Sequence, residues 1–300
     1  MSIVSIFTTL NFIENMSEKS IFFRYLVKSY LTGQPRQCPY CGSLDNDLIA
    51  RRRVIIQLRK CHNCGLMFRY PKETPEYNQK YYQQDYQEGI TTDMPSPETI
   101  EKWKQVNFKG TPVDFTEKLN LFNLFIQQGK VLDFGASWGY VSYQLAAAGY
   151  DVVGYELSKT RGGYAKKHLG VRMIDSLQEL EKYRETFDAI YTSHVIEHVP
   201  YPKDLFNLFL KLLKPKGKLI AFVPNCQSMS QIMGHGFGMH HVLALNKEFL
   251  EPALLNQGFE NTFFTSSPYH FDKIKKFAES NLKYDDKLEG DELFFVATKK

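Results

Sequence analysis

The chain has 300 residues, a formal net charge of +4 and a hydrophobic content of 43%. This length suggests about two domains, and the sequence has no apolar run long enough to span a bilayer. So small a charge does not by itself indicate a nucleic-acid partner. The first twenty residues lack the basic start and unbroken apolar run of a signal peptide, so we expect a cytoplasmic protein.

Residues 1–35 form a predicted helical segment, because apolar side chains such as Ile6, Leu10 and Ile13 recur at helical spacing. Residues 36–72 follow with two C-x-x-C pairs, each ending in a glycine that suits a tight metal knuckle. Four thiolates at this spacing predict a zinc ribbon. The predicted ligands are Cys38, Cys41, Cys61 and Cys64.

Two other interpretations of the cysteines are weaker. Disulfides are rare in cytosolic proteins, and a redox pair needs only one C-x-x-C motif. The fifth cysteine, Cys226, fits a small buried residue. Residues 51–60 and 65–71 are predicted strands of the ribbon. The basic run at 51–53 fits a solvated face, with an RNA-binding face as the alternative.

Residues 73–113 are polar and rich in tyrosine, and we expect a lid over the site or a packed linker, with a helix starting near Pro97. The candidate lid residues are Tyr77, Tyr81, Tyr82 and Tyr86. From residue 114 to 300 strands and helices alternate, which predicts a doubly wound α/β domain with a seven-stranded sheet. The predicted strands cover 130–134, 151–155, 171–174, 187–192, 217–223, 259–265 and 292–298, and the predicted helices 114–128, 138–148, 158–168, 203–213 and 246–256.

The stretch "VLDFGASWGY" at 131–140 predicts a strand, a glycine turn and a helix start. A dinucleotide fingerprint would need glycine at 137 and 140, where Ser137 and Tyr140 stand, so NAD is not favoured. Asp133, at the end of the strand, could meet an ammonium group, and the free N–H groups of the helix favour a carboxylate. Glu156 ends the next strand and suits the two hydroxyls of a ribose. An amino acid joined to a ribose describes S-adenosylmethionine.

Residues 114–300 resemble class I S-adenosylmethionine-dependent methyltransferases, which implies a Rossmann-like sheet in the methyltransferase strand order. The resemblance rests on "VLDFGASWG", "DVVGYELS", "VRMIDSL", "FDAIYTSHVIEHV" and "LKPKGKLIAFVPN". Ser137 replaces the middle glycine of the family, but a small residue there should leave room for the cofactor. The ribbon, ending in "CGL-x-F-x-x-P", resembles the subset with an N-terminal zinc module, many of which act on sugars, polysaccharides or natural products.

The resemblance also implies roles for single residues. Asp133, Gly135 and Gly139, with Ser137 between the glycines, hold the methionine end, and Glu156 binds the ribose. Asp175 meets the adenine amino group; alternatively it caps a short helix starting at Ser176. Ser193 and His194 face the sulfonium.

Methyl transfer needs an aligned acceptor and, for a hydroxyl, a base. We predict His241 as this base, with His194 as its partner or substitute, because Asn246 could cap the next helix and fix His241 better than His235, which lies among glycines. Alternatively, the histidine motif only orients the cofactor, and the glycine-rich loop is simply mobile.

His194, Glu197 and His198 have the spacing that places three ligands on one helical face. Ubiquinone-biosynthesis O-methyltransferases and small-RNA 2′-O-methyltransferases resemble this pattern, with a metal that meets acceptor hydroxyls, and His241 could match a later ligand of the RNA enzymes. Histidine at 194 in place of glutamate would suit Zn²⁺ or Fe²⁺ better than Mg²⁺.

Taken together, the sequence predicts methyl transfer from S-adenosylmethionine to a small-molecule or sugar acceptor, most simply at oxygen, with a structural Zn²⁺ in the ribbon. One alternative is an RNA 2′-O-methyltransferase that uses the metal and the basic ribbon. The other is an inactive interaction protein that only binds the cofactor.

Overall fold

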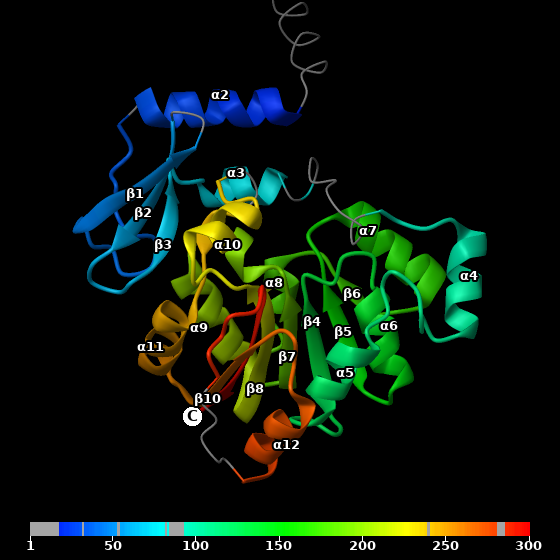
Figure 1. Ribbon diagram of the computed structural model, residues 1–300. Coiled ribbons are helices and arrows are strands. Elements are labelled where there is room, and N and C mark those ends of the chain that lie inside the picture. The colour runs from blue at the N-terminus through cyan, green and yellow to red at the C-terminus, as the bar shows by residue number, and fades with distance from the viewer. Residues whose placement is uncertain are drawn as a thin grey trace, which may run out of the picture.

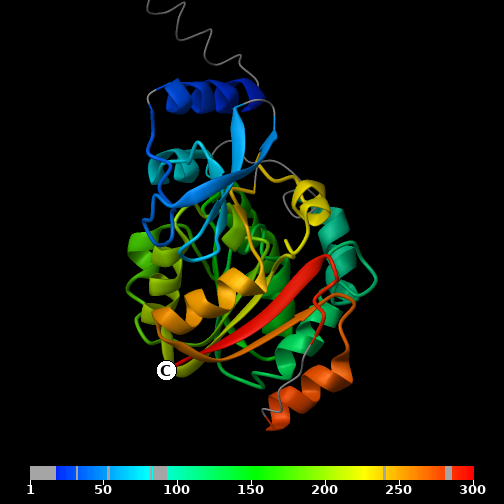
Figure 2. The same cartoon turned by 60° about the vertical axis from the view of Figure 1, so that its left-hand side comes forward.

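The computed structural model describes residues 18–31, 33–52, 55–81, 83, 93–238, 241–280 and 286–300. A seven-stranded sheet forms the body of the molecule. A second sheet of four strands lies at one end, with helix α2 (Glu18–Leu31) outermost; both views show them at the same end (Figures 1 and 2). Within the described residues, no helix has the length and apolar character needed to cross a bilayer.

The large sheet has the strand order β10-β11-β8-β7-β4-β5-β6. Strand β11 runs antiparallel to both of its neighbours, and the pairs from β8 to β6 are parallel. All seven strands occur where the sequence predicts them, so the predicted fold class is confirmed. Their bounds are β4 (Lys130–Phe134), β5 (Asp151–Tyr155), β6 (Met173–Ile174), β7 (Phe187–Ser193), β8 (Leu213–Pro224), β10 (Phe259–Ser266) and β11 (Glu292–Lys299).

Helices cover both faces of this sheet, because alternate strand residues point to opposite sides. Leu132 and Phe134 pack with one set of helices, and Val131, directly before them, packs with the other. The first set is α8 (Leu177–Leu180), α9 (Pro202–Leu212) and α11 (Lys247–Gln257), and the second is α5 (Thr116–Asn123), α6 (Tyr140–Ala147) and α12 (Phe271–Ser280). A smaller cluster around Trp138 joins α4 (Pro97–Gln105) to the π-helix η2 (Ala165–Leu169), which continues α7 (Lys159–Tyr164).

The small sheet has the order β1-β2-β3-β9. The prediction of one strand over 51–60 is wrong, because the run divides into the antiparallel strands β1 (Asn46–Arg52) and β2 (Ile56–Cys61). The sequence between them contains no glycine, proline or asparagine to mark a turn. Strand β3 (Met67–Tyr70) lies within the predicted 65–71.

The fourth strand of the small sheet comes from the other half of the chain. Strand β9 (Leu243–Ala244) pairs antiparallel with β3, opposite Phe68 and Met67. Ribbon residues Cys38 and Leu66 are buried in the same hydrophobic cluster as the strands and helices of the large sheet. The ribbon is therefore built onto the α/β body.

Helix α3 (Pro75–Lys80) follows the ribbon, and Tyr77 on it stacks against Tyr25 of α2 with ring centroids 3.9 Å apart. Tyr82 and Tyr86 lie outside the described residues, so the lid or linker stays a prediction. Helix α10 (Met229–Gly234) begins the long connection between β8 and β9.

Candidate functional site

The four cysteines predicted as zinc ligands come together at the tip of the ribbon. Their Sγ atoms all lie within 4.8 Å of one another. The Cys38–Cys64 and Cys41–Cys61 Sγ separations are 3.6 and 3.5 Å. A zinc ion with four Zn–S bonds of about 2.3 Å requires sulfur separations of about 3.8 Å. The cluster therefore fits a tetrahedral zinc ion.

The two knuckles of this site have matching backbones. Gly42 and Gly65 both have positive φ angles, of 76° and 77°, a conformation that favours glycine. Each donates its N–H to the carbonyl of the first cysteine of its pair, at 3.0 Å in both. All five cysteines are free, so the structure does not support the two-disulfide interpretation.

The glycine turn after β4 forms one wall of a cavity of about 880 Å³. Gly135 has a φ of +83°, and a Cβ there would lie 2.3 Å from Val195 Cγ2, so the turn packs closely against the segment after β7. Ser137 has a φ of +49°, in the left-handed region where glycine is favoured. Gly139 instead packs against η2, where a Cβ would lie 2.8 Å from Ala165 Cβ.

Glu156 presents a buried carboxylate to this cavity, as expected for a ribose-binding acid. It accepts hydrogen bonds from the Ser137 and Ser158 amides at 2.9 and 2.8 Å. Arg161, which also lines the cavity and which the sequence did not suggest, pairs with it at 2.8 Å. These three contacts fix the carboxylate, and a carboxylate has enough lone pairs to accept further hydrogen bonds.

Asp133 is placed differently from what the sequence suggests. Its side chain is 2% exposed and accepts a hydrogen bond from Ser142 Oγ at 2.6 Å, beneath α6. Burial raises its pKa to about 7, with the charge of Glu156 adding to the rise. Among the described residues it does not line the cavity, so its contact with an ammonium group stays a prediction.

Of the remaining predicted cofactor residues, Ser193 lines the described wall of the cavity and Asp175 does not. Ser193 lines the cavity, and its Oγ accepts from Lys118 Nζ at 3.2 Å. Asp175 is half-buried and absent from the part of the wall that the structure describes. The alternative role for Asp175 is wrong, because Ser176 itself caps α8 by accepting from the Glu179 amide.

Three histidines surround one buried carboxylate at the other side of the cavity. Glu197 lies in the short 3₁₀ helix η3 (Ile196–His198) and is 1% exposed. Its Oε1 lies 3.4 Å from His194 Nδ1, 3.9 Å from His198 Nε2 and 4.0 Å from His241 Nε2. The three histidines all line the cavity. The structure thus brings both predicted catalytic histidines, His194 and His241, to the same carboxylate.

His194 and His241 differ in charge. For His194, burial acts to lower the pKa, but the carboxylates of Glu197 and Glu292 outweigh it and raise the pKa to about 9. For His241, burial and the neighbouring His198 lower the pKa to about 3. At neutral pH His194 is therefore a donor, and His241 is a neutral imidazole that can accept.

His194 is held by a network of hydrogen bonds and ion pairs that no pattern in the sequence indicates. Its Nε2 lies 2.7 Å from Glu292 Oε1, at the start of β11, and the backbone of His194 has a φ of +54°. Lys118 and Tyr269 also donate to Glu292, both at 2.5 Å. The four residues of this network come from four separate segments of the chain, so only the fold brings them together.

Glu197, His198 and His241 could also hold a metal, because one ligand atom of each lies within 4.8 Å of the others. Among the described residues, neither Glu197 oxygen has a hydrogen-bond partner. Two imidazoles and one carboxylate form the donor set that non-haem Fe²⁺ and Zn²⁺ accept. Asn246 caps α11 as predicted, with its Oδ1 accepting from the Phe249 amide at 3.1 Å.

A sheet of this order, with a glycine turn after β4 and a carboxylate at the end of the neighbouring β5, defines the fold of S-adenosylmethionine-dependent methyltransferases. Residues 97–262 match the family model described as "Methyltransferase domain". The chain belongs to this family, which confirms the predicted class.

Two curated proteins and one solved structure are among those similar to the chain. The chain is 30% identical over 123 residues to the ubiquinone biosynthesis O-methyltransferase of Dechloromonas aromatica, covering 39% of this chain and 53% of that protein. The corresponding protein of Coxiella burnetii is 30% identical over 147 residues, covering 42% and 63%. The chain thus spans about half to just under two-thirds of these relatives. The structure of phosphoethanolamine N-methyltransferase 2 of Haemonchus contortus, solved with S-adenosyl-L-methionine, has a TM-score of 0.50 at 17% identity, covering 78% of this chain and 61% of that one.

Proposed function

We propose that the protein transfers a methyl group from S-adenosylmethionine to a hydroxyl oxygen of a small, carbohydrate-like acceptor. One observation carries the proposal: a single continuous cavity joins the glycine turn and Glu156 to the histidine cluster around Glu197. At about 880 Å³ it has room for a nucleoside cofactor together with a small acceptor. The similarity to ubiquinone biosynthesis O-methyltransferases supports oxygen as the acceptor atom.

The cofactor supplies a methyl group on a positively charged sulfur. In our proposal Gly135 and Ser137 receive its methionine end, Glu156 accepts from the ribose hydroxyls, and Ser193 lies near the sulfonium. Asp133 holds the turn from beneath through Ser142. Arg161 keeps the Glu156 carboxylate oriented before the cofactor arrives.

His241 orients the acceptor hydroxyl by accepting its proton in a hydrogen bond. The proton of a hydroxyl group becomes very acidic once the oxygen has gained a methyl group. A weakly basic imidazole is therefore sufficient to remove this proton. The buried Glu197 carboxylate, 4.0 Å from His241 Nε2, stabilises the imidazolium that results. His194, already protonated, forms an ion pair with Glu197 at 3.4 Å and holds this carboxylate instead of competing for the proton.

The test is a methyl-transfer assay with labelled cofactor on a panel of sugars, hydroxylated aromatic compounds and RNA 3′ ends. We expect turnover on a small hydroxylated compound, and His241→Ala should lower it about 100-fold or more while S-adenosylhomocysteine affinity stays unchanged. Full activity in His241→Ala with loss in His194→Ala would move the role to His194. Binding without any turnover would instead support an inactive interaction protein, and turnover on RNA alone the RNA alternative.

A metal-assisted version of this reaction is the second candidate. It is favoured by the buried Glu197 carboxylate, whose oxygens lack hydrogen-bond partners among the described residues although histidines surround it. In this version Glu197, His198 and His241 would hold a divalent cation that binds the acceptor oxygen. Chelation should then abolish activity, and Zn²⁺ or Fe²⁺ should restore it in the wild type but not in Glu197→Gln. Activity that survives chelation would reject this version.

A further inference from the structure

We propose that Asn78 is a positioning residue through which the zinc ribbon sets the geometry of the His198–His241 pair. The inference rests on the proposed function only in treating this pair as the acceptor side of the cavity. The two histidines lie edge to face with ring centroids 4.7 Å apart. They come from η3 and from the connection after β8, which share no strand or helix.

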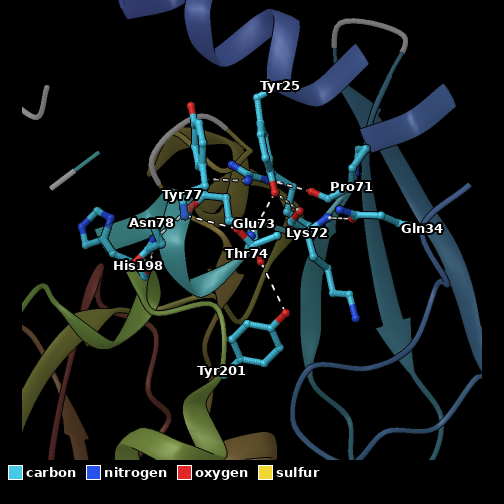
Figure 3. Close-up of polar contacts among 11 residues, drawn as sticks. Tyr25, Gln34, Pro71, Lys72, Glu73, Thr74, Tyr77, Asn78, His198 and Tyr201 are labelled. Carbon is cyan, nitrogen blue, oxygen red and sulfur yellow. Dashed lines mark hydrogen bonds and ion pairs between the residues drawn. The ribbon is translucent and has the colours of Figure 1, made fainter. Parts of the chain in front are cut away.

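The first link is the side-chain amide of Asn78. Its Nδ2 donates to the His198 carbonyl at 3.1 Å and to Glu73 Oε2 at 2.7 Å (Figure 3). Asn78 also lines the cavity beside His198. One side chain therefore connects the segment after the ribbon to the backbone of a histidine in the site.

Glu73 is itself anchored on the ribbon. Its Oε1 pairs with Arg69 Nη2 at 2.7 Å, and the two side chains are 5% and 0% exposed. Arg69 belongs to β3, which begins just after the last zinc-binding cysteine. Because a buried ion pair loses its compensation if one partner moves, Glu73 must stay in register with β3.

Helix α3, which carries Asn78, is fixed by α2. The Tyr25 hydroxyl donates to the Lys72 carbonyl at 3.1 Å and accepts from the Thr74 amide at 2.9 Å, and Thr74 Oγ1 caps the helix (Figure 3). The Tyr25 ring stacks on Tyr77. These contacts define the start and the direction of α3, and so the place of Asn78.

A second link reaches the other histidine through the backbone. The Arg69 amide donates to the Val242 carbonyl at 2.8 Å, and the Val242 amide donates to the Glu197 carbonyl at 3.0 Å. Val242 follows His241 directly and precedes β9. The connection before it contains Gly236 and Gly238 at positive φ, so local sequence alone does not fix its path. Strand β3 thus positions His241 and Glu197 through these backbone hydrogen bonds, and His198 through Glu73 and Asn78.

The test compares Asn78→Ala with Asn46→Ala. Asn46 is a matched control, since its Nδ2 likewise makes two hydrogen bonds, here to the carbonyls of Arg36 and Leu44, but it lies on the edge strand β1 and does not line the described wall of the cavity. The readout is the imidazole nitrogen NMR spectrum of the full zinc-loaded chain, together with S-adenosylhomocysteine affinity. We expect Asn78→Ala to shift the His198 and His241 signals and leave His62 unchanged. Asn46→Ala should shift only His62, whose ribbon neighbour Asp47 is next to Asn46.

The affinity for S-adenosylhomocysteine should stay within about twofold of the wild-type value in both variants, which shows that the fold is intact. Tyr25→Phe is a milder second variant that removes only the hydroxyl, and it should shift His198 and His241 in the same direction but less. Asn78→Gln, which keeps the amide, should recover part of the wild-type spectrum. Unmoved His198 and His241 signals in Asn78→Ala would overturn the inference. This readout needs no acceptor, so a failure of the proposed O-methylation would leave its result intact.

Discussion

The Glu156 carboxylate is buried and lines the cavity. The Ser137 and Ser158 amides and Arg161 hold it, so its position is fixed before any ligand binds. We expect Glu156→Ala to weaken S-adenosylhomocysteine binding at least tenfold by calorimetry, because hydrogen bonds to a charged acceptor contribute about 1.5–3 kcal/mol each. Asp175→Ala, at a residue that does not line the described wall, should change affinity much less. Equal losses in the two variants would contradict this placement.

Asp133 makes stability depend on pH. Its folded pKa of about 7 lies above the usual 3.8 because the side chain is buried. The folded state therefore favours the protonated acid. This contribution is fully present below about pH 4 and is lost as the pH rises to about 7. An asparagine at this position would be neutral at every pH, and its side-chain carbonyl could still accept from Ser142.

Asp133→Asn should consequently raise the unfolding temperature of the ligand-free protein, more at pH 8 than at pH 5. A pKa change of this size corresponds to a few kcal/mol, and each kcal/mol to about 2–4 °C for a protein of this length. Thermal unfolding at the two pH values measures the difference. Parallel pH profiles for the two proteins would show that Asp133 does not titrate in this range.

Sequence reasoning locates residues well where a strand ends and poorly where partners come from distant elements. The place of Glu156 follows from the end of a predicted strand. The burial of Asp133 does not, because a strand-end residue can turn toward the cavity or toward α6. Lys118, Glu292 and Tyr269 meet at His194 only through the order of the sheet, and no local pattern marks them.

At the scale of elements, the paired knuckles make zinc binding a property of the ribbon. Purified protein should contain about one zinc per chain. Cys61→Ser should lose it, because tetrahedral coordination needs all four sulfurs. Cys226→Ser is the matched control, as Cys226 is an equally buried cysteine outside the cluster. Elemental analysis that finds as much zinc in Cys61→Ser as in the wild type, or none in the wild type, would contradict the assignment.

How well a helix or strand can be predicted depends on how clearly its pattern of apolar residues and turns is marked in the sequence. The seven strands of the large sheet are apolar runs bounded by turns, and all occur near their predicted positions. The β1–β2 hairpin has no turn residue to mark it, so its sequence predicts a single strand. Strand β9 has only two residues and is defined by its pairing with β3, which no single-sequence pattern can show.

At the scale of the whole molecule, the ribbon and the α/β body share one interior. Tyr40, within the first knuckle, donates to the Ala253 carbonyl of α11 at 3.1 Å and packs edge to face on Phe249. Cys61 and Phe68 are buried in the same cluster as Leu250. Loss of the ribbon would therefore uncover apolar surface on the body.

We accordingly expect one cooperative unfolding transition for the full chain in scanning calorimetry, and not one for residues 36–72 and another for 114–300. Because zinc binds only the folded ribbon, chelation should lower the temperature of this whole transition. S-adenosylhomocysteine, which binds the other part of the molecule, should raise the same transition in zinc-loaded protein. Cys61→Ser should behave as chelated wild type does and respond to neither zinc nor chelator. Two separate transitions, with the upper one unaffected by zinc, would show that the ribbon and the α/β body unfold independently in spite of the β3–β9 pairing.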